Sequence, residues 1–206
     1  AYVAGTRTAA LIWRKGGFPV GTATEAQLQL PDLAPTLLDL AGGDYSGKKL
    51  DGKSFVAILA GKADSIHDSL YFEMGYGRAV MKDGFKYLAL RYPEYAENMP
   101  LEERRKLLEE NNAVLAARGR PIPTTDPMEP FSHLFLIPGG HDVDQVAIKG
   151  YPSFSDRDQL YDLGKDPGEQ NNLVSNPECA AKLADLKKEL DAYVRRLPGT
   201  FGEFGK

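Results

Sequence analysis

The first sixty residues alternate between short apolar runs and breaks rich in glycine or proline. Residues 9–13 form an apolar run whose length, and the glycines that follow it, predict a buried strand. Apolar positions at helical spacing predict a helix over residues 31–41, and Gly42 follows as a C-cap. A second short helix is predicted from Ser54 to Ala60, before Gly61.

From residue 69 the pattern changes to that of an antiparallel sheet. Strands are predicted over residues 69–74, 78–82 and 85–91. Between the last two lies Asp83-Gly84, which favours a type I′ turn because both central residues of that turn need positive φ. Residues 159–163 predict a fourth strand that joins this sheet later in the chain.

A long excursion, residues 93–158, separates the third strand from the fourth. It begins with a charged surface helix over residues 100–117 and continues through 119–158, which are rich in proline and glycine. Loops of this length inside a compact domain usually serve function or are disordered. Two histidines flank an apolar run in this segment, which argues against simple disorder.

The last helix, residues 177–197, has the clearest pattern. Asn176 is a good N-cap and Pro177 suits the first helical position. The apolar positions form one stripe, which we expect to pack on the antiparallel sheet: Leu183, Leu186, Leu190, Val194 and Leu197. The chain therefore predicts an α/β protein whose C-terminal portion is α+β.

Composition narrows the class of protein. The net charge of −4 gives no electrostatic reason to expect nucleic acid, and no apolar run has membrane-spanning length. The N-terminus lacks the pattern of a signal peptide and does not start with Met, so we expect a fragment or a processed chain. The single Cys179 excludes an internal disulfide framework and a multi-cysteine metal site.

Candidate chemistry is sparse. His133 and His141 are eight residues apart, which fits no standard zinc spacing, and we predict that either binds substrate by donating to an anion or a sugar hydroxyl. His67 is expected in a loop before a strand, and Cys179 as a small helix residue. The acidic residues Asp142, Asp144, Asp156 and Asp158 are interpreted as solvated loop carboxylates rather than a cation site. No catalytic residue and no metal ligand is assigned.

Five segments, in order, resemble the C-terminal portion of a formylglycine-dependent (type I) sulfatase of the alkaline phosphatase-like superfamily. They are residues 1–13, which resemble the family's Tyr-Glu-Gly-Gly-x-Arg strand entry; 32–42, which resemble the following helix; 50–55, a Leu-Asp-Gly-x-Ser loop; 79–87, the hairpin; and 159–173, the Leu-Tyr-Asp-Leu, Asp-Pro-x-Glu, Asn-Leu ending. The resemblance implies two parts. Residues 1–65 end the catalytic domain, and 66–206 form a C-terminal subdomain with an antiparallel sheet of about four strands and a packed C-terminal helix.

The resemblance also implies where the chemistry lies. Such enzymes hydrolyse sulfate esters, often on sugars, with a formylglycine nucleophile and a calcium ion, and their residues for both lie upstream of this chain. Cys179, followed by Ala180-Ala181-Lys182, does not match the modified motif. We therefore expect this chain to be inactive alone, to bind neither cofactor, and to wall the substrate cleft beside its N-terminal catalytic portion. The family's habit implies a periplasmic or secreted location.

Two alternatives remain open from the sequence. One is the same portion of a related phosphodiesterase or phosphonate hydrolase, which the upstream nucleophile and metal ligands would distinguish. The other is a stand-alone carbohydrate-binding or interaction module. The first forty residues argue against this module because they have the pattern of one end of a larger sheet.

Overall fold

The computed structural model describes residues 2–129, 134, 136, 137 and 150–206, and these group into two compact units. One unit is Arg7–Leu70. The other joins the chain up to Thr6, which includes α1 (Val3–Thr6), with Tyr71–Lys206. The domain division at residues 65/66 stays a prediction about the whole protein.

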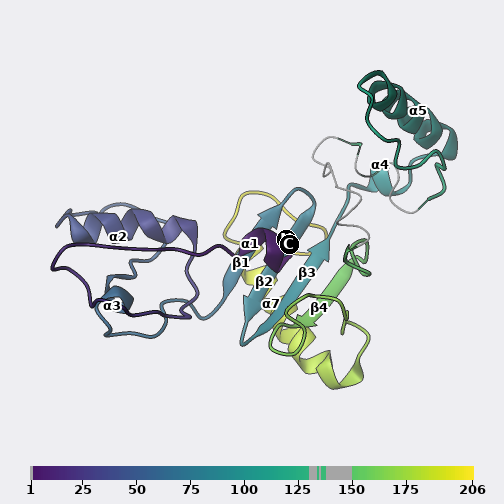
Figure 1. Cartoon of the computed structure of the whole chain (residues 1–206). Helices are drawn as coiled ribbons and strands as arrows, with labels where there is room; N and C mark the ends of the chain where they lie inside the picture. The colour runs from purple at the N-terminus through teal and green to yellow at the C-terminus, as the bar shows by residue number, and fades with distance from the viewer. Residues whose placement is uncertain (1, 130–133, 135, 138–149) are drawn as a thin grey trace. The chain divides into compact units, whose positions relative to one another are not determined.

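The second unit, the sheet unit, is built on a four-stranded antiparallel sheet of order β1-β2-β3-β4 (Figure 1). Its strands are β1 (Leu70–Met74), β2 (Gly77–Lys82), β3 (Phe85–Leu90) and β4 (Asp158–Asp162). Lys82 pairs with Phe85, and the two residues between them have φ of 52° and 76°, as the type I′ turn requires. The predicted strands and their turn are confirmed.

Helix α7 (Ala180–Val194) packs on β2 and β3 and follows the 3₁₀ turn η2 (Pro177–Cys179). The Asn176 side chain accepts a hydrogen bond from the Glu178 backbone N–H, so the predicted N-cap is confirmed. Leu186, Leu190 and Val194 are buried in the main core with residues of the sheet.

The predicted end of this helix is wrong. Leu197 lies beyond α7 and is 41% exposed. The backbone N–H of Leu197 donates to the Val194 carbonyl, which tightens the final turn just before Pro198. The place of Leu197 in the core is taken by Phe201 and Phe204, whose backbones pair with each other and whose side chains are buried.

The Arg7–Leu70 unit contains η1 (Leu30–Asp32), α2 (Leu33–Leu40) and α3 (Val56–Leu59). Both predicted helices are confirmed, each slightly shorter than expected. The predicted buried strand at residues 9–13 is wrong, because the segment forms no strand and Leu11 and Trp13 are 97% and 80% exposed. A strand needs a hydrogen-bonded neighbouring strand, and no segment within residues 7–69 is a strand.

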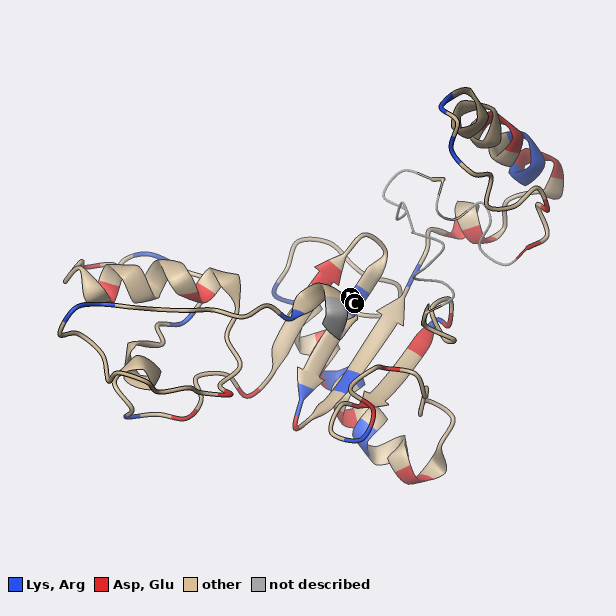
Figure 2. Ribbon diagram, in the orientation of Figure 1, with Lys and Arg blue, Asp and Glu red and all other residues tan. Residues whose placement is uncertain are grey.

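The excursion begins with α4 (Glu94–Glu97) and α5 (Leu101–Ala117), which confirms the predicted charged helix. In Figure 2 the ribbon of α5 is partly blue and partly red, which marks its basic and its acidic residues. Leu134 and Ile137 of the excursion are buried in one cluster with Ala96 of α4 and Met99. Over the part of the chain that is described, no helix has both the length and the apolarity to span a membrane.

Candidate functional site

Of the residues predicted to carry chemistry, His133 and His141 lie outside the described residues, so their substrate-binding role stays a prediction. His67 lies in the loop before β1, as expected. Cys179 is half-buried at the end of η2 and packs against the main core, as a small helix residue should.

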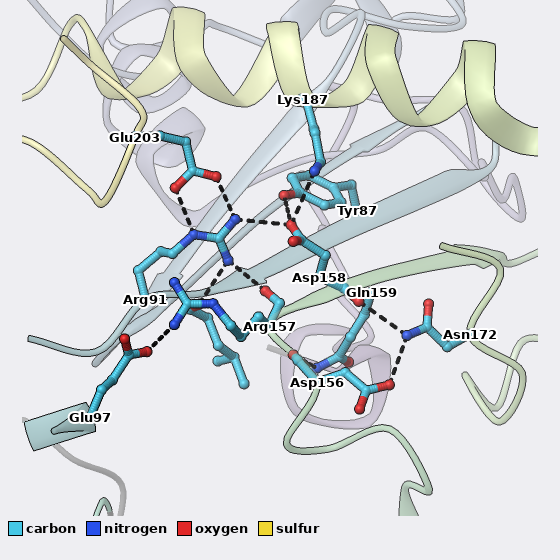
Figure 3. A network of polar contacts seen from close by, with 11 residues as sticks. Tyr87, Arg91, Glu97, Asp156, Arg157, Asp158, Gln159, Asn172, Lys187 and Glu203 are labelled. Carbon is cyan, nitrogen blue, oxygen red and sulfur yellow. Dashed lines mark hydrogen bonds and ion pairs between the residues drawn. The ribbon is translucent and has the colours of Figure 1, made fainter. Parts of the chain in front are cut away.

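A polar network joins the end of β3 to the start of β4 and to the C-terminal tail (Figure 3). The Arg91 guanidinium is 5% exposed and donates to both carboxylate oxygens of Glu203, at 2.8 Å and 2.6 Å. It also donates to Asp158 Oδ1 at 3.0 Å and to the backbone carbonyls of Leu90 and Arg157. A planar guanidinium can serve this many acceptors at once, so Arg91 fixes the two strand ends together.

The Asp158 carboxylate contacts basic side chains and a tyrosine hydroxyl. The Tyr87 hydroxyl donates to it, and Lys187 Nζ of α7 lies 3.4 Å from Oδ1 (Figure 3). Burial by itself would raise the pKa of Asp158, but the hydrogen bonds from Tyr87 and Arg91 outweigh it and lower the pKa below its ordinary value. The interpretation of Asp158 as a solvated loop carboxylate is therefore wrong, because it lies on β4 within an ion-pair network.

The excursion leaves and re-enters the sheet at adjacent points. The Leu90 backbone N–H donates to the Arg157 carbonyl at 2.8 Å, directly before β4 begins. The Arg157 side chain forms an ion pair with Glu97 of α4. The two ends of the excursion are thus joined to each other as well as to the sheet.

The start of the chain is fastened to β4. The Tyr2 hydroxyl donates to Gln159 Oε1 at 2.7 Å, and the Tyr161 hydroxyl donates to the same oxygen at 2.9 Å. The Tyr2 ring stacks on Tyr151 with 3.8 Å between ring centroids and on Phe154 with 5.8 Å. Burial raises the pKa of the Tyr2 hydroxyl well above its ordinary value and that of Tyr161 to about 12, so both remain neutral donors.

Two further buried acids hold backbone segments in place. Glu169, which has φ of 55°, accepts from Lys86 of β3. In the other unit, Asp32 is buried and accepts from the backbone N–H groups of Gln29 and Lys53, and its Oδ2 lies 2.8 Å from His67 Nε2. These contacts fold the loop after α2 against η1.

None of these groups makes a catalytic constellation. Over the described residues, no cluster of three His, Cys, Asp or Glu side chains could hold a metal ion. Asp156, interpreted from the sequence as a solvated loop carboxylate, is exposed just before β4 and accepts a hydrogen bond from Asn172. The arrangement can tie strands, loops and termini together, and it offers no nucleophile paired with a base among the interactions described.

Comparison with known proteins finds sulfatases that are similar to this chain. An ulvan-active sulfatase of Formosa agariphila is 26% identical over 197 residues, which cover 94% of this chain and 29% of that protein. Human arylsulfatase A is 29% identical over an alignment of 213 positions, which covers 98% of this chain and 33% of that protein. The chain is a relative of the sulfatases and corresponds to their C-terminal portion.

No family model matches the chain. Among solved structures, a 2-O GAG sulfatase is 22% identical with a TM-score of 0.43, over 80% of this chain and 24% of that one. A protein solved in complex with its substrate D-glucosamine-2-N,6-O-disulfate is 16% identical with a TM-score of 0.41, over 79% of this chain and 23% of that one. The chain thus spans about a third of the length of the curated sulfatases and about a quarter of these solved chains.

The sequence alone did not reveal the buried polar residues that hold distant segments of this sulfatase relative together. Lys86, Arg91 and Gln159 sit in predicted strands, and nothing local shows that their side chains are buried with partners from distant segments. Tyr2 gave a signal only as part of the family-like first motif. The Asp-Pro-Gly-Glu segment at residues 166–169 did mark a turn, and the buried Glu169 is the fourth residue of it.

Proposed function

We propose that this chain is the C-terminal part of a sulfatase that hydrolyses sulfate esters, carbohydrate sulfates among them. The observation that carries this proposal is the alignment of 94% of the chain with only 29% of a curated sulfatase. The reaction itself is assigned to the rest of the protein, because the described residues offer no nucleophile paired with a base. Alone, the chain is inactive.

The partner of this chain is the N-terminal catalytic portion of the same protein. The Arg7–Leu70 unit exposes several large apolar side chains, and covering them with another part of the protein would remove apolar surface from water. They are Leu11, Ile12, Trp13, Val20, Leu30, Leu33, Leu37 and Leu38.

The excursion is the part of this chain proposed to wall the substrate cleft. Its two ends meet at Arg157, so its sequence can vary while the sheet stays the same. Within it, His133 or His141 is proposed to donate to the sulfated sugar. Replacing residues 98–149 by a Gly-Ser linker in the full-length enzyme tests the role: turnover of a small aryl sulfate should persist while turnover of the sulfated glycan is lost.

Calcium and formylglycine are proposed as cofactors of the full-length enzyme, where they supply charge stabilisation of the sulfate and the attacking hydroxyl. The described residues do not fit a calcium site, because no three suitable ligands converge there. No step is therefore assigned to either group within this chain. A periplasmic or secreted location belongs to the same proposal.

The deciding experiment expresses the complete reading frame and, separately, these 206 residues. Each is assayed with an aryl sulfate, an aryl phosphodiester and an aryl phosphonate ester. We expect the full-length protein to release sulfate and the 206-residue chain to release none. Preference for the phosphorus esters, or native-like sulfate release by the 206 residues alone, would refute the proposal.

A further inference from the structure

The residues up to Thr6 belong to the same unit as Tyr71–Lys206. Tyr2 is 9% exposed and lies in the sheet unit, whereas residues 7–70 form the other unit. Its hydroxyl reaches Gln159 across 157 positions of sequence. Tyr2 therefore fastens the segment before Arg7 to the sheet.

Tyr2 is held by contacts at both its hydroxyl and its ring. Gln159 is fully buried, and its amide nitrogen donates to the Asp156 carbonyl at 3.0 Å, which fixes the orientation of its oxygen. That oxygen accepts from Tyr2 and Tyr161, and the Tyr2 ring lies flat on Tyr151 at an interplanar angle of 15°. A ring held on its face and at its hydroxyl has little freedom to shift or rotate.

We propose that Tyr2 is a positioning residue, through which the sheet unit holds the preceding catalytic segment of the full-length sulfatase in its working place. This inference rests on the proposed function. Because Tyr2 is anchored, the chain just N-terminal to it starts from a fixed point, and residues a few positions upstream inherit that restraint. Displacements of about 1 Å in a catalytic group can lower turnover about a hundredfold.

The competing explanation is that Tyr2 only fills an aromatic core. The chain offers a matched pair of variants that separates the two. Tyr2→Phe and Tyr161→Phe each remove one hydroxyl from the same Gln159 oxygen and leave the other donor in place. They differ in which segment is released, since Tyr161 lies within β4 and Tyr2 lies in the N-terminal segment.

The test uses the full-length protein and both variants. Kinetics with an aryl sulfate, thermal unfolding and amide hydrogen exchange at residues 2–6 are measured together. We expect Tyr2→Phe to lower kcat by about tenfold with little change in KM, and to speed exchange at residues 2–6. Tyr161→Phe should change kcat by less than about twofold, even where it lowers the unfolding temperature as much.

Equal kcat for the two variants, or a loss of kcat that simply follows the loss of stability, would overturn the inference. Tyr2→Ala, which also removes the ring stack, should lower kcat further if the anchor is real. A full-length wild type without sulfatase activity would instead refute the proposed function. In that case hydrogen exchange still decides: equal exchange at residues 2–6 in the two Phe variants rejects the anchor, and faster exchange in Tyr2→Phe alone supports it.

Discussion

The Nζ atom of Lys86 lies 2.7 Å from Oε1 of Glu169, and both side chains are only 1% exposed. The pair joins β3 to the turn that follows β4, across 83 positions of sequence. Burial lowers the pKa of Lys86 below its ordinary value, and the adjacent Glu169 opposes that effect. Two buried charges are tolerable here because each supplies the partner of the other.

Removing one member of this pair should strongly destabilise the sheet unit. Lys86→Ala is expected to lower the free energy of unfolding by about 3–5 kcal/mol, because Glu169 is left as an uncompensated buried charge. The double variant Lys86→Met with Glu169→Gln should lose less than Lys86→Ala. Urea unfolding measures both.

The control for the ion pair is Lys106→Ala. Lys106 lies 4.0 Å from Glu110 on α5, and its side chain is 77% exposed. Exposed pairs of this kind contribute about 0.3–0.5 kcal/mol. Equal costs for Lys86→Ala and Lys106→Ala would contradict the assignment of Lys86 to a buried pair.

Gly52 should tolerate no side chain. A Cβ atom at this position would lie 2.1 Å from the Pro31 carbonyl oxygen, and the next residue, Lys53, donates its backbone N–H to Asp32. We expect Gly52→Ala to cost about 1–3 kcal/mol, since the backbone of the loop would have to move. Gly47→Ala is the matched control, because a Cβ there meets nothing within 4 Å. Thermal unfolding that ranks the two variants equally would be evidence against the close approach.

The Arg91 network should make stability depend on acid pH. The hydrogen bond from Arg91 lowers the pKa of Glu203, and hydrogen bonds lower that of Asp158 against the opposing effect of burial. Both groups therefore bind protons more readily when the chain is unfolded. Their contribution is complete above their unfolded pKa values, about 4, and is lost as the pH falls through the lower folded values.

Glu203→Gln should consequently flatten the fall of the unfolding temperature between about pH 5 and pH 3. The effect should be modest, under about 1 kcal/mol, because the Glu203 side chain is 58% exposed. Glu129→Gln changes an exposed carboxylate elsewhere and serves as the control. Identical pH profiles for wild type and Glu203→Gln would argue against the network.

The two histidines of the excursion are tested in the full-length enzyme. His133→Ala or His141→Ala should lower kcat/KM for the sulfated glycan by about tenfold or more, the loss expected when one hydrogen bond to a charged group is removed. Turnover of a small aryl sulfate, which cannot reach a distant sugar subsite, should change little. Unchanged glycan kinetics in both variants would remove the histidines from the substrate site.

Local signals predicted most of the regular structure. Asp83-Gly84 specifies its own turn, and Asn176 specifies the start of the last helix, because each acts on backbone groups a few residues away. The strand at residues 9–13 was mispredicted because an apolar run does not reveal whether a neighbour pairs with it. Leu197 was misassigned for a related reason: the stripe continues in sequence, but the helix ends first.

The candidate site depended on distant partners and was less predictable. Arg91 meets Glu203, and Tyr2 meets Gln159, across more than a hundred positions of sequence. The spacing of residues in a single sequence does not reveal either of these pairs. The family-like motifs identified the relatives correctly because five of them occur along the chain in the order that the family has.

The connections between the strands differ greatly in length, and this affects the order in which the sheet folds. Two residues connect β2 to β3, whereas residues 91–157 lie between β3 and β4. Loop-closure entropy rises with length, by about 0.6 kcal/mol per doubling, and distant pairings form more slowly. The hairpin should therefore nucleate first and β4 should dock afterwards. Gln159, which accepts the hydrogen bond from Tyr2, lies on β4. The binding place of Tyr2 would therefore form only in the final steps of folding.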